Sequence, residues 1–179
     1  LVIAAGPGGK GTVCLEDLRL EDTGYYLTPA VQASSALPGY APLHVLDSSA
    51  ATRWRSASAF EPQQLLIDFQ CVREFGGLTI CWDTQRLPRA FDIRLSCDGS
   101  EWTTCFSTAQ GVARETHAYL PGAVSRFVCI DLKESMQRTG FGIVRVQVQP
   151  HAFSRSINDF FSAIAQRGCS GLYPKYLAR

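Results

Sequence analysis

Charged residues are scarce in this chain, and so are the patterns that would point to charged partners. Only 18% of the 179 residues are Asp, Glu, Lys or Arg, the formal net charge is +1, and Lys and Arg form no run. A surface with no surplus of positive charge gives little electrostatic attraction for phosphate, so no nucleic-acid partner is expected. No apolar run is long enough to span a bilayer.

The motifs of common enzymes and metal sites are also missing. The seven cysteines include no CxxC pair, which argues against zinc. No P-loop, Rossmann glycine pattern or nucleophile elbow occurs. The histidines share no ligand spacing: His44, His117 and His151. Carboxylates stand singly, as at Glu61, Asp83, Glu101 and Glu115. We therefore expect no enzyme activity in this fragment.

The cysteines are odd in number and show no disulfide pattern. Cys97 and Cys105 flank a turn at Asp98-Gly99, but a turn centred there would place position 97 opposite position 102. Buried free thiols behave as small apolar residues, and we expect that role for the cysteines in general. In particular, we predict free thiols at Cys71, Cys81 and Cys97.

Short strand patterns fill the middle of the chain. Leu65, Ile67 and Phe69 alternate with polar or outward positions across 64–70, the period-2 pattern of a half-buried strand. Similar segments are Leu78–Trp82, Phe91–Leu95, Ser125–Ile130 and Phe141–Val148. About eight short antiparallel strands without a long helical period predict an all-β jelly-roll sandwich from about Pro29 to Gln149.

Four segments, in order along the chain, resemble the motifs of a known domain family. Asp47–Ser56 reads Asp-Ser-Ser-Ala-Ala-Thr-Arg-Trp-Arg-Ser, and Ser96–Trp102 reads Ser-Cys-Asp-Gly-Ser-Glu-Trp, with a tight Asp-Gly turn. Together with 64–70 and 125–131, they resemble the discoidin domain over about residues 30–150. This family is also called factor V/VIII type C, and its bacterial members include the family 32 carbohydrate-binding modules. The resemblance implies a galactose-binding-like sandwich with a core that contains Trp54, Trp82 and Trp102.

The same prediction names the core residues of the sandwich. We expect the following side chains to be mostly buried: Leu65, Ile67, Ile80, Phe91, Ile93, Trp102, Phe127, Val128 and Val146.

The two ends have a different character. Residues 1–22 form either the closing hairpin of a preceding β module or an N-terminal extension of the main domain, residues 29–150. In 151–179, Ile157, Phe160, Phe161 and Ile164 recur at helical spacing after a capping-box-like Ser156. This pattern predicts an amphipathic helix of about ten residues, stopped near Gly168 and followed by a linker toward a further domain.

The resemblance also implies a calcium loop, although the sequence departs from it. Asp47 and Thr52 match the family's ligands, whereas the position of the closing-strand Glu is Arg145. Because calcium gains most from anionic oxygens, this replacement argues against a bound ion, and no cofactor is expected. We predict instead that Arg145 forms an ion pair with Asp47, which makes the site degenerate.

Sugar binding in the family uses loops at one end of the sandwich, where an aromatic ring stacks on the sugar and polar groups bond its hydroxyls. Arg55 follows the tryptophan of the central motif, where some galactose-binding members place a polar contact. The candidate glycan-binding residues are Tyr40, Arg55, Phe60, Arg86, His117 and Phe141, with Arg53 and Arg89 nearby.

The resemblance favours a non-catalytic carbohydrate-binding module, an accessory part of a larger bacterial glycoside hydrolase. Its partners would be a glycan and neighbouring domains, and its setting secreted or periplasmic, although the odd cysteine count argues mildly against this. The alternative is an architectural or adhesion module without a sugar site, which braces its neighbours through the 157–164 stripe. Without basic residues around the exposed loops, membrane binding is not expected.

Overall fold

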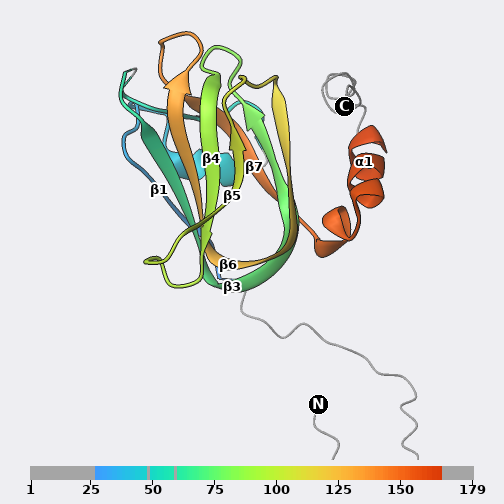
Figure 1. Ribbon diagram of the computed structural model, residues 1–179. Coiled ribbons are helices and arrows are strands. Elements are labelled where there is room, and N and C mark those ends of the chain that lie inside the picture. The colour runs from blue at the N-terminus through green and yellow to red at the C-terminus, as the bar shows by residue number, and fades with distance from the viewer. Residues whose placement is uncertain (1–26, 48, 59, 167–179) are drawn as a thin grey trace, which may run out of the picture.

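The computed structural model describes residues 27–47, 49–58 and 60–166, so the predictions for 1–22, Gly168 and the linker lie outside it. The described strands are β1 (Ala30–Ala33), β2 (Trp54–Arg55), β3 (Gln63–Trp82), β4 (Pro88–Ser96), β5 (Thr103–Thr108), β6 (Glu115–Ser135) and β7 (Gly142–Gln149). The helices are the 3-10 turns η1 (Pro42–Leu46) and η2 (His151–Ser154) and the α-helix α1 (Ile157–Gln166). All strand pairs are antiparallel, and the predicted jelly-roll sandwich is confirmed (Figure 1).

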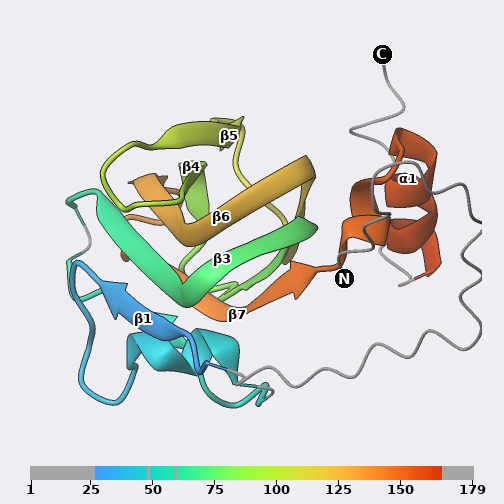
Figure 2. The ribbon, with the colours of Figure 1, turned by 90° about the horizontal axis from the view of Figure 1, so that it is seen from below.

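Two long strands, β3 and β6, run through both layers of the sandwich. The first half of β3 pairs with β1 and with the second half of β6. The second half of β6 also pairs with β4, and β4 pairs with β5, which completes this layer. The second half of β3 pairs with β7 and with the first half of β6. The segments predicted as two strands, 64–70 and 78–82, are therefore one bent strand. Figure 2 shows both strands folding sharply where the layers meet.

The bend in β3 has a local cause. The β3–β6 register shifts between Asp68 and Arg73 and again between Phe75 and Gly77, and Gln70 has a positive φ of 65°. A Cβ on Gly77 would lie 2.3 Å from the carbonyl oxygen of Ala118, so only glycine allows this close approach of the backbones. The bend therefore depends on local backbone geometry, which hydrophobic alternation does not reveal.

The core lies between the layers and is built from the alternating positions. Seven of the nine side chains predicted as core are buried, and Trp54 and Trp82 are 0% and 1% exposed. Trp102 and Phe127 are half-buried and lie outside the core cluster, which corrects their prediction as core residues. Their ring centroids lie 6.4 Å apart, and the Trp102 indole N–H donates to the Gly99 carbonyl at 3.1 Å. These rings pack on the hairpin itself rather than between the layers.

Helix α1 packs on the sandwich of its own domain. Phe160 is 3% exposed and makes edge contacts with Tyr119 of β6 and Phe153 of η2, each with centroids 5.1 Å apart. Ser156 caps the helix, because its hydroxyl accepts from the Asp159 N–H at 3.1 Å. The partner surface of the predicted stripe is thus β6 and η2, and its use as a brace for neighbouring domains is wrong for Phe160. No helix within the described ranges is long and apolar enough to cross a membrane.

The thiols divide into two groups. Cys71, Cys81 and Cys97 are free, as predicted. The expectation that the cysteines are buried is wrong for several of them. Cys81 and Cys129 are buried, whereas the exposed ones are Cys71, Cys97 and Cys105.

Candidate functional site at the loop end

Four connections meet at one end of the sandwich. In Figure 1 the segments 56–58, 60–62, 83–87 and 136–141 lie together at the upper end, opposite the β4–β5 hairpin. Backbone hydrogen bonds join them: the Ser56 N–H donates to the Phe141 carbonyl at 2.9 Å, and the Gly142 N–H donates to Arg86 at 3.0 Å. The fourth connection is tied in by Leu37, whose N–H donates to the Arg55 carbonyl at 2.9 Å. This end is therefore a fixed platform.

Asp83, at the end of β3, is the charged centre of this platform. Its side chain is 1% exposed, and its carboxylate accepts a bond from Arg55 Nε at 2.6 Å. Arg53 lies 3.7 Å away on the other carboxylate oxygen. Arg55 also donates to Gln85 at 2.9 Å, and its guanidinium lies 4.7 Å from the centroid of the Tyr40 ring. A buried carboxylate needs a paired charge, and Arg55 supplies one to Asp83. Because Arg55 also contacts Gln85 and Tyr40, the network holds three of the loops in fixed positions relative to one another.

A second set of contacts closes the other side of the platform. Arg86 Nη1 donates to the Ser56 carbonyl at 3.1 Å, and the Ser56 hydroxyl accepts from the Phe141 N–H at 2.9 Å. Gly140, at φ 90°, fits against these groups, since an added Cβ would lie 2.6 Å from the Ser56 hydroxyl oxygen. Arg86 thus joins the loop that contains it, 83–87, to the segment that begins at Ser56.

Beside this network lies a small pocket of about 200 Å³, with Phe60 at its rim. The Phe60 side chain is 86% exposed, the largest exposed fraction among the large apolar side chains of the described residues. The other lining residues are Glu61, Lys133, Glu134, Ser135, Arg138 and Phe141. Two of the charged groups have partners nearby: Lys133 pairs with Asp92, and Glu134 accepts from Arg89 at 3.2 Å. An exposed aromatic ring surrounded by charged hydrogen-bonding groups can hold a polar ligand that has an apolar face.

The structure brings together five of the six predicted site residues at this end. Tyr40, Arg55 and Arg86 belong to the loop network, and Phe60 and Phe141 line the pocket. Phe141, a candidate glycan-binding residue, has no exposed ring that could stack on a sugar. The ring is 1% exposed and belongs to the core.

His117 is not a loop residue, which corrects its prediction as a glycan contact. It lies in β6, is 1% exposed, and has its Nδ1 3.0 Å from the Thr79 hydroxyl oxygen across the strand pair. Its Nε2 lies 3.7 Å from a Glu115 carboxylate oxygen. A histidine at the start of a strand can be read from sequence as part of the preceding loop, and here the pairing with β3 buries it.

The predicted pair between Asp47 and Arg145 is wrong. Asp47 accepts from the Thr52 hydroxyl at 2.7 and 2.8 Å and from the Ser49 N–H at 3.0 Å, so its loop closes on itself. Arg145 lies opposite Cys81 in the β3–β7 pairing and points a guanidinium nitrogen to its sulfur at 3.8 Å. No group of three Cys, His, Asp or Glu side chains able to hold a metal occurs among the described residues. With one carboxylate, the Asp47 loop does not fit a calcium ion.

Three charged residues that line the Phe60 pocket were not predicted from the sequence: Lys133, Glu134 and Arg138. Lys133 and Glu134 lie just before the last residue of β6, and Arg138 follows in the next turn with a positive φ of 57°. The available signal was a charged cluster between a strand and the turn Arg-Thr-Gly at 138–140.

Comparison with known proteins identifies the family. The model of the F5/8 type C domain matches residues 30–146. The chain belongs to the F5/8 type C, or discoidin, family. No curated protein matches it.

Solved structures agree on the fold of this discoidin domain. Chitosan-binding module 2 of a chitosanase/glucanase from Paenibacillus sp. IK-5, in complex with chitotriose, is 24% identical with a TM-score of 0.65 and covers 69% of this chain and 98% of its own. A family 32 module of Clostridium perfringens, in complex with GalNAc-β-1,3-galactose, is 13% identical with a TM-score of 0.58 and covers 68% and 94%.

Proposed function

We propose that this discoidin domain is a non-catalytic carbohydrate-binding module whose sugar site is the Phe60 pocket. The observation that carries the proposal is the exposed Phe60 ring at the rim of a hollow on the rigid loop end. A pyranose presents an apolar face of C–H groups and a polar edge of hydroxyls, and the pocket offers a counterpart to each. Support also comes from the two similar structures described above, both of which carry a bound sugar.

The size of the pocket suggests how the sugar is held. At about 200 Å³ it is smaller than the roughly 300 Å³ at which sites for drug-sized ligands begin. It therefore suits one ring at the end of a glycan rather than a stretch of polymer. Glu61 and Arg138 have no ion-pair partner in the described part of the chain, which leaves them for the sugar hydroxyls.

Binding of this kind is weak. One stacked ring with a few exposed hydrogen bonds corresponds to a Kd near the millimolar range, or roughly −4 kcal/mol. Such affinity is useful in an accessory module of a larger glycoside hydrolase, because tethering raises the effective concentration of a linked catalytic domain at its polymer. The domain itself would perform no chemistry.

Arg55 has a different role in this proposal from the one its sequence position suggests. Its guanidinium is occupied by Asp83, Gln85 and Tyr40. We expect Arg55→Ala to weaken sugar binding only through loss of loop order, together with a lower melting temperature.

The test is a glycan-array screen, followed by calorimetric titration of the best glycan that has no free amine into three proteins. Phe60→Ala should abolish measurable binding while the melting temperature stays unchanged, since the ring is exposed. The matched control is Val72→Ala, which removes another exposed apolar side chain, 54% exposed, from β3. Retained binding in Phe60→Ala, or no binding to any glycan by the original chain, would refute the proposal.

The adhesion alternative has less support. Of the apolar loop residues predicted to insert into a partner, Tyr40 is half-buried against Arg55 and Phe141 is buried, whereas Phe60 is 86% exposed.

A further inference from the structure

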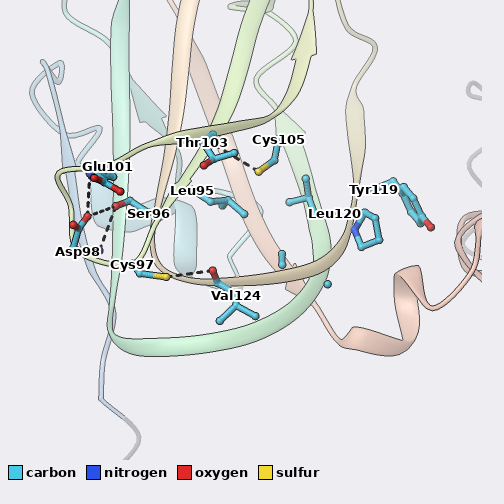
Figure 3. Close-up of a pocket in the computed structure, with 13 residues that line it drawn as sticks. Leu95, Ser96, Cys97, Asp98, Glu101, Thr103, Cys105, Tyr119, Leu120 and Val124 are labelled. Carbon is cyan, nitrogen blue, oxygen red and sulfur yellow. Dashed lines mark hydrogen bonds between the residues drawn. The ribbon is translucent and has the colours of Figure 1, made fainter.

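A larger hollow lies on another part of the molecule, away from the loop end. It is a groove of about 510 Å³ between the β4–β5 hairpin and the bend of β6 (Figure 3). One wall runs from Leu95 to Thr103 and on to Cys105, and the other runs from Tyr119 to Val124. The volume falls within the range of 300 to 1,000 Å³, typical of ligand sites. None of its lining residues lines the Phe60 pocket.

The charge of this groove has one sign. Its lining includes the carboxylates of Asp98 and Glu101, and no Lys, Arg or His. In Figure 3 both acids lie at the same end of the groove, with Tyr119 at the other. A hollow with only negative charge attracts cations and repels anions.

The two acids differ in how they are bound. Asp98 belongs to the hairpin turn: its carboxylate accepts from the Ser100 hydroxyl at 2.6 Å and from the Ser100 and Glu101 N–H groups at 2.9 and 3.0 Å. These bonds, chiefly the one from the Ser100 hydroxyl, hold the pKa of Asp98 well below its usual value. The exposed Glu101 carboxylate has no hydrogen bond or ion pair within the described residues, so it can turn toward a ligand.

The rest of the lining is suited to a sugar. Leu95, Leu120 and Ala123 are buried and form an apolar floor, against which C–H groups can pack. Hydroxyls of Ser96, Thr103 and Tyr119 also belong to the lining. The groove thus combines apolar surface, hydroxyls and carboxylates.

We propose that this groove is a second ligand site, which binds an amino-sugar oligosaccharide through its free ammonium groups. The choice of a sugar rests on the proposed function, whereas the choice of a cation rests on the charge of the groove. The ammonium group lies against Glu101 and Asp98, and the sugar rings lie along the floor toward Tyr119. The site is independent of Phe60, so the two proposals can fail separately.

The test uses a glucosamine trimer, with its fully N-acetylated form as the neutral analogue. Titrations into the Phe60→Ala variant report the groove alone. Glu101→Gln should weaken binding of the amine trimer about two- to fivefold, the range of one exposed charge pair, and leave the acetylated trimer unaffected. Higher ionic strength should reduce the difference between the two trimers. Val124→Trp fills the groove from a position that is 48% exposed, so the domain still folds, and should abolish binding.

A second readout uses the native thiols. Cys97 and Cys105 are exposed and line the groove, whereas Cys71 is exposed and does not. Bound trimer should slow alkylation of the first two and leave Cys71 unchanged. The proposal is overturned if Glu101→Gln and Val124→Trp both leave the titration unaltered, or if Phe60→Ala alone removes binding. Binding of trilysine as tight as that of the amine trimer would overturn the assignment to a sugar.

Discussion

Removing the charge of Asp83 should destabilise the domain more than any comparable change at an exposed ion pair. Asp83→Asn keeps the shape of the side chain but leaves Arg55 without its carboxylate. The Asp83 side chain is 1% exposed and that of Arg55 17%, so the remaining charge is only partly solvated. Loss of one partner of a buried pair costs about 3–5 kcal/mol, and we take about 3 kcal/mol because Arg55 reaches some water.

This magnitude can be measured by thermal and urea unfolding. In a domain of this size, 1 kcal/mol corresponds to roughly 2–4 °C, so Asp83→Asn should lower the melting temperature by about 6–12 °C. The control is Glu134→Gln, which breaks the pair with Arg89, whose side chains are 56% and 60% exposed. That change should cost less than about 1 kcal/mol. Equal losses in the two variants would refute the reasoning that burial makes Asp83 the centre of the platform.

Three further predictions concern metal, pH and thiols. Because the Asp47 loop closes through Thr52, calcium or a chelator should leave the melting temperature unchanged; tight binding at a hundredfold excess over Kd would instead add about 2.7 kcal/mol. Hydrogen bonds from Arg126 lower the pKa of Asp68, so this carboxylate stabilises the fold above about pH 4 and stabilises it less as the pH falls further. Asp68→Asn should therefore flatten the acid side of a plot of melting temperature against pH. An unchanged plot would contradict this prediction. Alkylation of the native chain should be fast at the exposed Cys71 and Cys97 and slow at Cys81 and Cys129, because burial raises the pKa of these two thiols. Equal alkylation rates at the exposed and buried thiols would contradict this prediction.

The fold could be predicted from the sequence where local rules are strong. The alternation around Ile67, the turn at Asp98-Gly99 and the cap at Ser156 each depend on neighbours in sequence, and the structure confirms all three. The continuity of β3 was not predicted, because its bend depends on a positive φ at Gln70 and on the approach of Gly77 to β6. Such features depend on contacts between distant residues.

The candidate site was harder to predict for a similar reason. A loop segment identifies residues that could face a ligand, but burial decides which of them do. Phe60 and Phe141 are both phenylalanines near the loop end, yet one is 86% exposed and the other 1%. Asp83, a single carboxylate in the sequence, becomes central only because the β3 end places it against Arg55.

The sharing of β3 and β6 between the two layers has a consequence for how the domain opens. A sandwich of two separate sheets can lose one sheet while the other keeps its hydrogen bonds. Here each layer contains half of both long strands, and the β3–β6 pairing runs from Gln63 opposite Leu132 to Cys81 opposite Glu115. Separation of the layers would require the same strands to be broken in their middle. Amide protons in the two halves of β3 should therefore exchange with solvent at similar rates, through one cooperative opening event.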